Sequence, residues 1–134
     1  MNCLYCGAGT KVINSRSQKR SNHTWRRRQC TNCKHVFTSI ELPDLATSFV
    51  FLPSSGQVEP FCRDKLFLSV YNSLGHRKDA LEASTSLTDT ILSRLLKATD
   101  GSAIGRTKLI DAATEVLKSF DKAAAVQYSA YHPI

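Results

Sequence analysis

The sequence predicts an α+β protein of two modules: a small N-terminal three-stranded antiparallel sheet that carries four cysteines, and a mainly helical domain with a short β-hairpin. Two observations lead to this prediction. Residues 1–42 contain two Cys-x-x-Cys pairs and few large aliphatic residues. Beyond residue 65, apolar residues recur at the three- and four-residue spacing of amphipathic helices. We therefore place one domain at residues 1–42 and a second at residues 47–134.

The net charge of +7 is concentrated in the cysteine-bearing segment. Residues 1–42 hold eight Lys or Arg against one acid, Glu41, whereas the rest of the chain carries ten of each sign. Clustered basic charge is the electrostatic footprint of nucleic-acid binding. The asymmetry therefore favours a polyanionic partner for the first module; the alternative is a basic face that is only solvated.

The two cysteine pairs predict a metal site. Cys3 and Cys6 form one pair, Cys30 and Cys33 the other, and two such turns complete a tetrahedral four-thiolate site for one Zn²⁺. A segment of about 40 residues with so little apolar content cannot fold on its own core, so metal binding and folding are expected to be one event. A redox Cys-x-x-Cys and two disulfides are the alternatives. Because all four ligands are used, the site is structural and not catalytic.

The basic run "TWRRRQC" leads directly into the second cysteine pair. As a strand, it points Arg26 and Arg28 to one side and Trp25 and Arg27 to the other. Guanidinium groups suit phosphate oxygens and the acceptor edge of guanine, which makes these arginines candidates for DNA contacts. The full set of candidate DNA-binding residues is Arg16, Arg26, Arg27, Arg28 and Lys34.

The rest of the chain predicts the second domain. Residues 42–48 are typical of a linker or a domain edge, and residues 49–61 favour two short strands around a Ser-Ser-Gly turn. Helices are expected around 66–74, at 79–98 (or from Ser86, a second candidate cap), at 109–120 and at 123–131. The side chains expected to face the core are Leu66, Phe67, Val70, Tyr71, Leu74, Leu81, Leu87, Ile91, Leu92, Leu95, Leu109, Ile110, Ala113, Val116, Leu117 and Phe120.

Other features set limits on function. No apolar run approaches the roughly 20 residues of a membrane helix, and the N-terminus lacks the pattern of a signal peptide. We expect a cytoplasmic protein that is not an enzyme, because no Ser-His-Asp set or carboxylate pair has a context that supports catalysis. Cys62, the fifth cysteine, precedes a helix and is expected to pack as a small apolar residue.

Five motifs follow one another along the chain: "CLYCG", "TKVINSR", "RRRQCTNCKHVFTSIE", "EPFCRDKL" and "VQYSAY". In this order they resemble the NrdR repressors, which regulate ribonucleotide reductase genes in bacteria. The resemblance implies a zinc ribbon that binds double-stranded DNA. It also implies an ATP-cone domain that binds ATP or dATP and sets the oligomeric state, so a homo-oligomer is expected.

The second domain departs from the family pattern at the nucleotide loop. The family has a Lys-Arg-Asp-Gly-like stretch there, whereas this chain has Pro53, Ser54, Ser55 and Gly56. Gly56 and Lys65 are the remaining candidates for nucleotide contacts. Each lost charged hydrogen bond is worth about 1.5–3 kcal/mol, so ATP or dATP is expected to bind poorly or differently.

We therefore interpret the sequence as a DNA-binding transcriptional regulator with one Zn²⁺ per chain and an ATP-cone-like domain for assembly. One alternative is a zinc-ribbon accessory protein that binds RNA polymerase, the ribosome or single-stranded nucleic acid. A fragment of a ribonucleotide reductase is a further alternative, but the chain lacks the length and the radical or thiol machinery for it.

Overall fold

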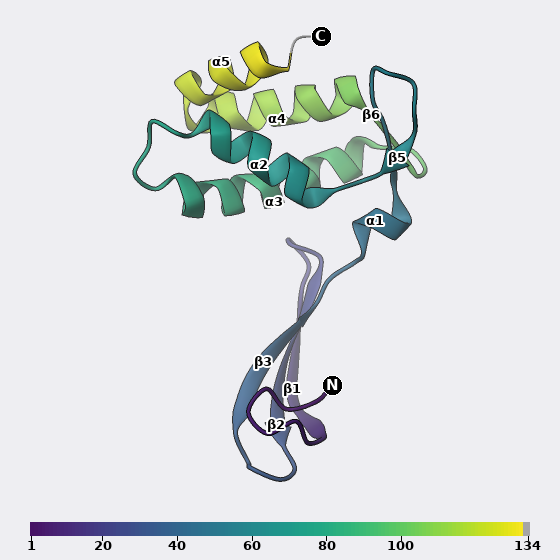
Figure 1. Cartoon of the computed structure of the whole chain (residues 1–134), viewed down its shortest axis with the longest axis vertical. Coiled ribbons are helices and arrows are strands. Elements are labelled where there is room, and N and C mark those ends of the chain that lie inside the picture. The colour runs from purple at the N-terminus through teal and green to yellow at the C-terminus, as the bar shows by residue number, and fades with distance from the viewer. Residues whose placement is uncertain (133–134) are drawn as a thin grey trace. The chain divides into compact units, whose positions relative to one another are not determined.

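The computed structural model describes residues 1–132 of the 134-residue chain. It consists of two compact units, Met1–Pro43 and the chain from Asp44 onward (Figure 1). The last two residues of the predicted second domain, 133 and 134, lie outside the described residues. Within the described part of the chain, no helix has the length and apolar character needed to cross a membrane.

The first unit is a three-stranded antiparallel sheet, which confirms the prediction. β1 (Thr10–Gln18) pairs with β2 (His23–Cys30), and β2 pairs with β3 (Val36–Glu41). The central strand is therefore the one that carries the run of arginines. A register shift between Val12 and Asn14 marks a bulge in β1, which increases the local twist of the sheet.

The first unit buries very little apolar surface. Among its residues, only Cys3, Cys30 and Phe37 are buried hydrophobic residues, and none of them belongs to the main apolar cluster of the protein. Domains of about 40 residues usually need disulfides, a metal or a partner to remain folded. The sheet must therefore be held by something other than an apolar core.

The second unit begins with a helical turn and a small mixed sheet. Asp44 caps α1 (Leu45–Ser48), and its carboxylate accepts a first-turn amide at 3.1 Å. β4 (Val50–Leu52) pairs antiparallel with β5 (Glu59–Pro60) and parallel with β6 (Ala103–Gly105). The predicted hairpin is present, but it is two strands of a three-stranded sheet.

Two features of this small sheet region differ from the sequence-based expectation. The segment 42–48, predicted to be a linker or a domain edge, includes the boundary between the two units, but it also contains the capped turn α1. The strand β6 was not predicted, because three residues after the turn at Gly101 are too few to show an alternating pattern. Its pairing with β4, about fifty residues earlier in the chain, is a tertiary effect.

Four helices complete the unit, as predicted: α2 (Arg63–Ser73), α3 (Ala80–Ala98), α4 (Arg106–Phe120) and α5 (Lys122–Tyr131) (Figure 1). Their boundaries lie within a few residues of the expected ones. The alternative start of the second helix at Ser86 is wrong, since α3 runs through this position without interruption.

The core of the second unit lies among these helices and includes β6. Thirteen of the sixteen side chains expected to face it are buried or half-buried, whereas Tyr71, Leu81 and Phe120 are exposed. The ring of Tyr71 instead stacks on Phe67, one turn earlier in α2. Tyr128 in α5 is the largest fully buried side chain, and the sequence analysis did not single it out.

A polar network ties the α2–α3 connection to the junction of α4 and α5. Asp121 caps α5 through Oδ1, which accepts the Ala124 amide at 3.2 Å, while Oδ2 accepts from His76 at 2.8 Å and from Arg77 at 3.1 Å. The Arg77 guanidinium also lies 4.6 Å from the centre of the Phe120 ring, which explains why this ring stays outside the core. Asp121 thus links the α2–α3 connection to the first turn of α5 through one carboxylate.

The same contacts set the charge of this carboxylate. The His76 side chain, the Ala124 amide and the Arg77 guanidinium together hold the pKa of Asp121 well below its usual range. A carboxyl group whose pKa is depressed by folding stabilises the folded state above its unfolded pKa of about 4. This stabilisation is lost as the pH falls from about 4 toward the depressed folded value.

Replacing Asp121 should therefore destabilise the second unit in a pH-dependent way. We expect Asp121→Ala to lower the Tm of helix unfolding by about 4–8 °C at pH 7, because a cap and two ion pairs are lost together. Thermal melts followed by circular dichroism at pH 7, 4 and 2 should show this difference shrinking at the lowest pH. Asp111→Ala is the control, because Asp111 is an exposed α4 position whose side chain makes no hydrogen bond or ion pair with residues 1–132. Equal melting of both variants would contradict this role.

Candidate metal centre and nucleic-acid interface

Four sulfur atoms converge at one end of the first sheet. The Sγ atoms of Cys3, Cys6, Cys30 and Cys33 all lie within 4.8 Å of one another. Two of the contacts cross between the pairs, at 3.6 Å for Cys3–Cys33 and 3.5 Å for Cys6–Cys30. A tetrahedral site with Zn–S near 2.3 Å places its sulfurs about 3.8 Å apart. The spacing therefore fits one tetrahedral metal ion.

Backbone amides converge on the same sulfurs. Tyr5 donates its amide to Sγ of Cys3 at 3.3 Å, and Asn32 donates its amide to Sγ of Cys30 at 3.3 Å. The Cys33 amide adds a second bond to Cys30 at 3.4 Å. Such amide-to-sulfur bonds stabilise metal-bound thiolates and fix their orientation. The two turns thus present their first cysteine in the same way.

The two turns also close in the same way. The amides of Cys3 and Cys30 each donate to a carbonyl five residues further along the chain, that of Ala8 at 2.7 Å and that of His35 at 2.9 Å. The residue after each pair has a left-handed backbone, with φ of +80° at Gly7 and +66° at Lys34. Both halves of the site therefore have the same backbone fold, although their sequences differ.

The ionisation of the thiols explains why the cluster needs a cation. Burial raises the pKa of the Cys30 thiol, but the amides of Cys33 and Asn32 outweigh it and lower this pKa to about 6. At Cys33 the amide of His35 favours the thiolate, yet burial and the neighbouring Cys30 raise the pKa to about 12. Four thiolates this close repel one another, and a bound Zn²⁺ removes the conflict because it requires deprotonated sulfur.

The alternatives for the cysteines can be compared with this arrangement. All five cysteines are free thiols, and the contacts in the cluster are far longer than the 2.05 Å of a disulfide bond. Cys62, at the start of α2, is exposed and lies outside the four-sulfur cluster. The exposed position differs from the packed one that the sequence predicts for it.

The comparison with protein families agrees with this geometry. Residues 1–41 match the family described as "Transcriptional repressor NrdR-like, N-terminal domain". The first unit is thus similar to the zinc ribbon of NrdR-type repressors. The match supports the resemblance to NrdR-type repressors, a family of zinc-binding transcriptional regulators. It ends at residue 41, and the assignment of the second unit therefore depends on its own residues.

The zinc ribbon places its arginines on both faces of the sheet. Arg26 and Arg28 share one face, where Arg26 bonds Glu41 at 3.0 Å and Arg28 bonds Ser39 at 2.8 Å. Arg16 lies opposite Trp25 in the register and therefore shares the other face, with Arg27. Of the expected arginine cluster, the structure thus brings together Arg16 and Arg27, and it separates them from Arg26 and Arg28.

Lys34, the remaining candidate for a DNA contact, belongs to the second cysteine turn. Its ammonium group donates to the carbonyl of Thr31 at 3.0 Å, which directs the side chain back toward its own turn. Beside it, the His35 ring stacks on Tyr5 at 4.5 Å, and its Nδ1 lies 3.3 Å from Sγ of Cys33. The sequence analysis missed this contact of His35 with the cluster, because no spacing rule marks a residue beside a ligand.

The two candidate nucleotide residues of the second unit lie in different elements. Gly56, with φ of +79°, closes a tight turn through a hydrogen bond from its amide to Pro53 at 3.2 Å. Lys65 lies in the first turn of α2 and pairs with Glu59 at 3.4 Å. The loop between β4 and β5 therefore offers no cationic side chain.

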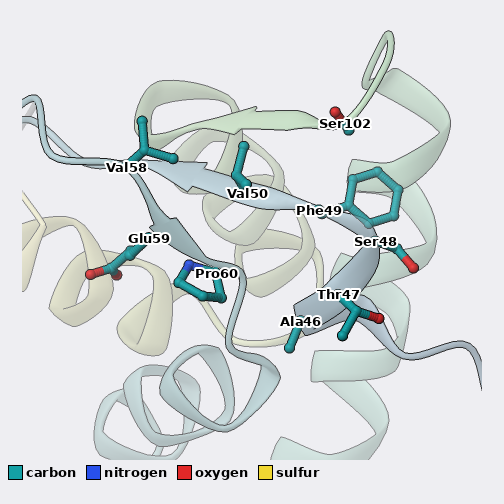
Figure 2. Close-up of a pocket in the computed structure, with 9 residues that line it drawn as sticks. All are labelled: Ala46, Thr47, Ser48, Phe49, Val50, Val58, Glu59, Pro60 and Ser102. Carbon is teal, nitrogen blue, oxygen red and sulfur yellow. The ribbon is translucent and has the colours of Figure 1, made fainter.

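One pocket of about 310 Å³ lies beside this small sheet (Figure 2). It is bordered by α1, by the two strands of the hairpin and by the loop before β6; its lining residues are Ala46, Thr47, Ser48, Phe49, Val50, Val58, Glu59, Pro60 and Ser102. The charged side chain among them is the carboxylate of Glu59. A negatively charged lining does not suit a triphosphate.

Removing one ligand should abolish metal binding. We expect one Zn²⁺ per chain in the wild-type protein, and its loss together with unfolding of the zinc ribbon in Cys30→Ser, because three thiolates do not close the site. Elemental analysis and circular dichroism measure both effects. Cys62→Ser is the matched control and should keep its metal. Full zinc content in Cys30→Ser would refute the four-thiolate site.

Proposed function

We propose that this protein is a DNA-binding transcriptional regulator of the NrdR type whose zinc ribbon binds duplex DNA. The observation that carries the proposal is the charge of the ribbon: eight Lys or Arg against one acid in residues 1–42. Five of these charges, Lys11, Arg16, Arg26, Arg27 and Arg28, lie on β1 and β2, and β2 ends in Cys30 of the four-thiol cluster. Basic side chains on a rigid sheet suit a polyanion of fixed shape. The protein can contact the phosphates of such a partner without a conformational change.

Duplex DNA fits this surface better than single-stranded nucleic acid. The major groove is about 12 Å wide and admits a two-stranded β-ribbon, while single-strand binders stack successive bases on several aromatic rings. In the described strands of the ribbon, the aromatic residues are Trp25, which is half-buried, and Phe37, which is buried. The accessory-protein alternative is an outcome of the binding test below.

We further propose that the second unit, taken as residues 47–134, is an ATP-cone-like domain that serves assembly. It keeps a hairpin and a helical core, but the loop that would meet phosphates is an uncharged turn. Exposed apolar side chains on the neighbouring helices α2 and α5, among them Leu68, Val126 and Tyr131, suit self-association into a homo-oligomer. Such a regulator acts in the cytoplasm, where the DNA is, and needs no catalytic activity.

DNA binding should depend strongly on salt. If about four phosphates are neutralised, the logarithm of the binding constant should fall with the logarithm of the salt concentration at a slope near −3.6. Fluorescence anisotropy with duplexes selected from a random pool measures this slope, and replacing Arg26, Arg27 and Arg28 together by Ala should weaken binding. Single strands and RNA of the same sequence are competitors. A preference for these competitors would favour the accessory-protein alternative.

Nucleotides should bind weakly and leave the assembly unchanged. We expect ATP and dATP to bind with Kd values in the high micromolar to millimolar range, about −4 to −6 kcal/mol, because the loop has lost its cations. Calorimetry and light scattering measure affinity and oligomer size. The matched variant with Pro53→Lys and Ser54→Arg restores two cations and should bind at least about 10-fold more tightly. A low-micromolar Kd for the wild-type protein, or a nucleotide-driven change in oligomer size, would refute this proposal.

A further inference from the structure

We propose that duplex DNA binds one particular face of the zinc ribbon, and that the arginines on the opposite face serve the protein itself. The binding face, called the Trp25 face below, is defined by Lys11, Arg16, Trp25 and Arg27. This inference rests on the proposed function, because it says where on the ribbon the DNA lies. It reverses the simplest interpretation of three consecutive arginines, in which all of them would contact DNA.

The register of the sheet determines which residues share a face. Residues directly opposite one another on paired strands project to the same side. Trp25 is opposite Arg16 in β1 and Ile40 in β3, and Arg27 is opposite Asn14 in β1 and Thr38 in β3. Arg16 and Arg27 are therefore diagonal neighbours on one side of the sheet, about 7–8 Å apart at the backbone.

The bulge in β1 does not break this arrangement. Beyond it, Lys11 is opposite Gln29, two residues along β2 from Arg27, and so joins the same side. The Trp25 face thus carries three cations along two adjacent strands. A bulge increases local twist, and a twisted two-stranded ribbon is a shape that the major groove accepts.

The opposite face is occupied by contacts within the ribbon. Arg26 donates to Glu41 at 3.0 Å and to Ser15 at 3.3 Å, and Arg28 donates to Ser39 at 2.8 Å. Phe37, directly opposite Arg28 in β3, is buried on this side. The guanidinium groups of this face therefore lie over the small interior of the ribbon.

The two faces differ in charge as well as in contacts. The single acid of the ribbon, Glu41, is opposite Thr24 and so lies on the side of Arg26 and Arg28. If DNA bound on that side, its phosphates would approach the carboxylate of Glu41 and would compete with it for Arg26. On the Trp25 face, the side chains of Lys11, Arg16 and Arg27 make no hydrogen bond or ion pair within the described residues 1–132. They are free to meet phosphates or base edges.

Single substitutions of arginines on the two faces test this inference in the full-length, zinc-loaded protein. We expect Arg16→Ala and Arg27→Ala each to weaken duplex binding on the order of 10-fold and to reduce the magnitude of the salt slope by about 1. The matched variants Arg26→Ala and Arg28→Ala should stay within about 2-fold of the wild type. Fluorescence anisotropy at several salt concentrations gives both quantities, and zinc content verifies that each variant is folded.

A second measurement uses the wild-type chain alone. Trp25 is the single tryptophan of the protein and lies on the proposed face. Bound duplex should reduce the quenching of its fluorescence by acrylamide, a neutral quencher that leaves the ionic strength unchanged. If DNA occupied the other face, the quenching of Trp25 would stay the same.

The outcomes separate this inference from the proposed function. Loss of binding in Arg26→Ala and Arg28→Ala with normal Arg16→Ala and Arg27→Ala would overturn the assignment of the face and leave DNA binding intact. Equal losses in all four variants, or unchanged Trp25 quenching in the complex, would also overturn it. A wild-type protein that binds no duplex at any salt concentration would refute the proposed function itself.

Discussion

The first unit depends on one constraint: four sulfur atoms must share a volume in which their negative charges cannot coexist without a cation. They lie within 4.8 Å of one another, and the unit has almost no other interior. Metal binding therefore replaces the apolar core that a sheet of this size cannot build. Because β2 ends in Cys30, the arrangement of the cluster also positions the strand that carries the arginines. The placement of the basic surface is thus a consequence of metal chemistry.

The second unit is stabilised by different means. Its helices bury a continuous apolar cluster, and the carboxylate of Asp121 links the α2–α3 connection to the first turn of α5. It carries equal numbers of acidic and basic residues. Lys65, which the sequence makes a candidate for nucleotide contacts, is paired with Glu59. One half of the chain therefore places unpaired positive charge on a surface, whereas the other half neutralises its charges and exposes apolar helix faces. This contrast agrees with the proposed division into DNA binding and assembly.

Much of this could be predicted from the sequence, for identifiable reasons. Two Cys-x-x-Cys turns each present two thiols on one side, so the spacing of the four cysteines predicts one shared metal site. The apolar periodicity of α3 and α4 is strong enough to predict these helices. The face of Arg16 could not be predicted, since it depends on a register that a bulge at Val12 has already shifted. The strand β6 and the burial of Tyr128 depend on partners far along the chain, which local patterns do not contain. Phe120 follows the helical pattern, but the Arg77 side chain keeps it at the surface.

The pairing of β4 with β6 has a consequence for the order in which the chain folds as it is synthesised. All strands of the zinc ribbon lie within the first 41 residues, so the ribbon can close around its metal as soon as they have emerged. β4 follows nine residues later, yet its parallel partner begins only at Ala103, after α2 and α3. Parallel strands always require such a crossover, and distant contacts form late. A nascent chain therefore carries a finished, charged ribbon while the first strand of its second unit still has an open edge, and the two units mature one after the other.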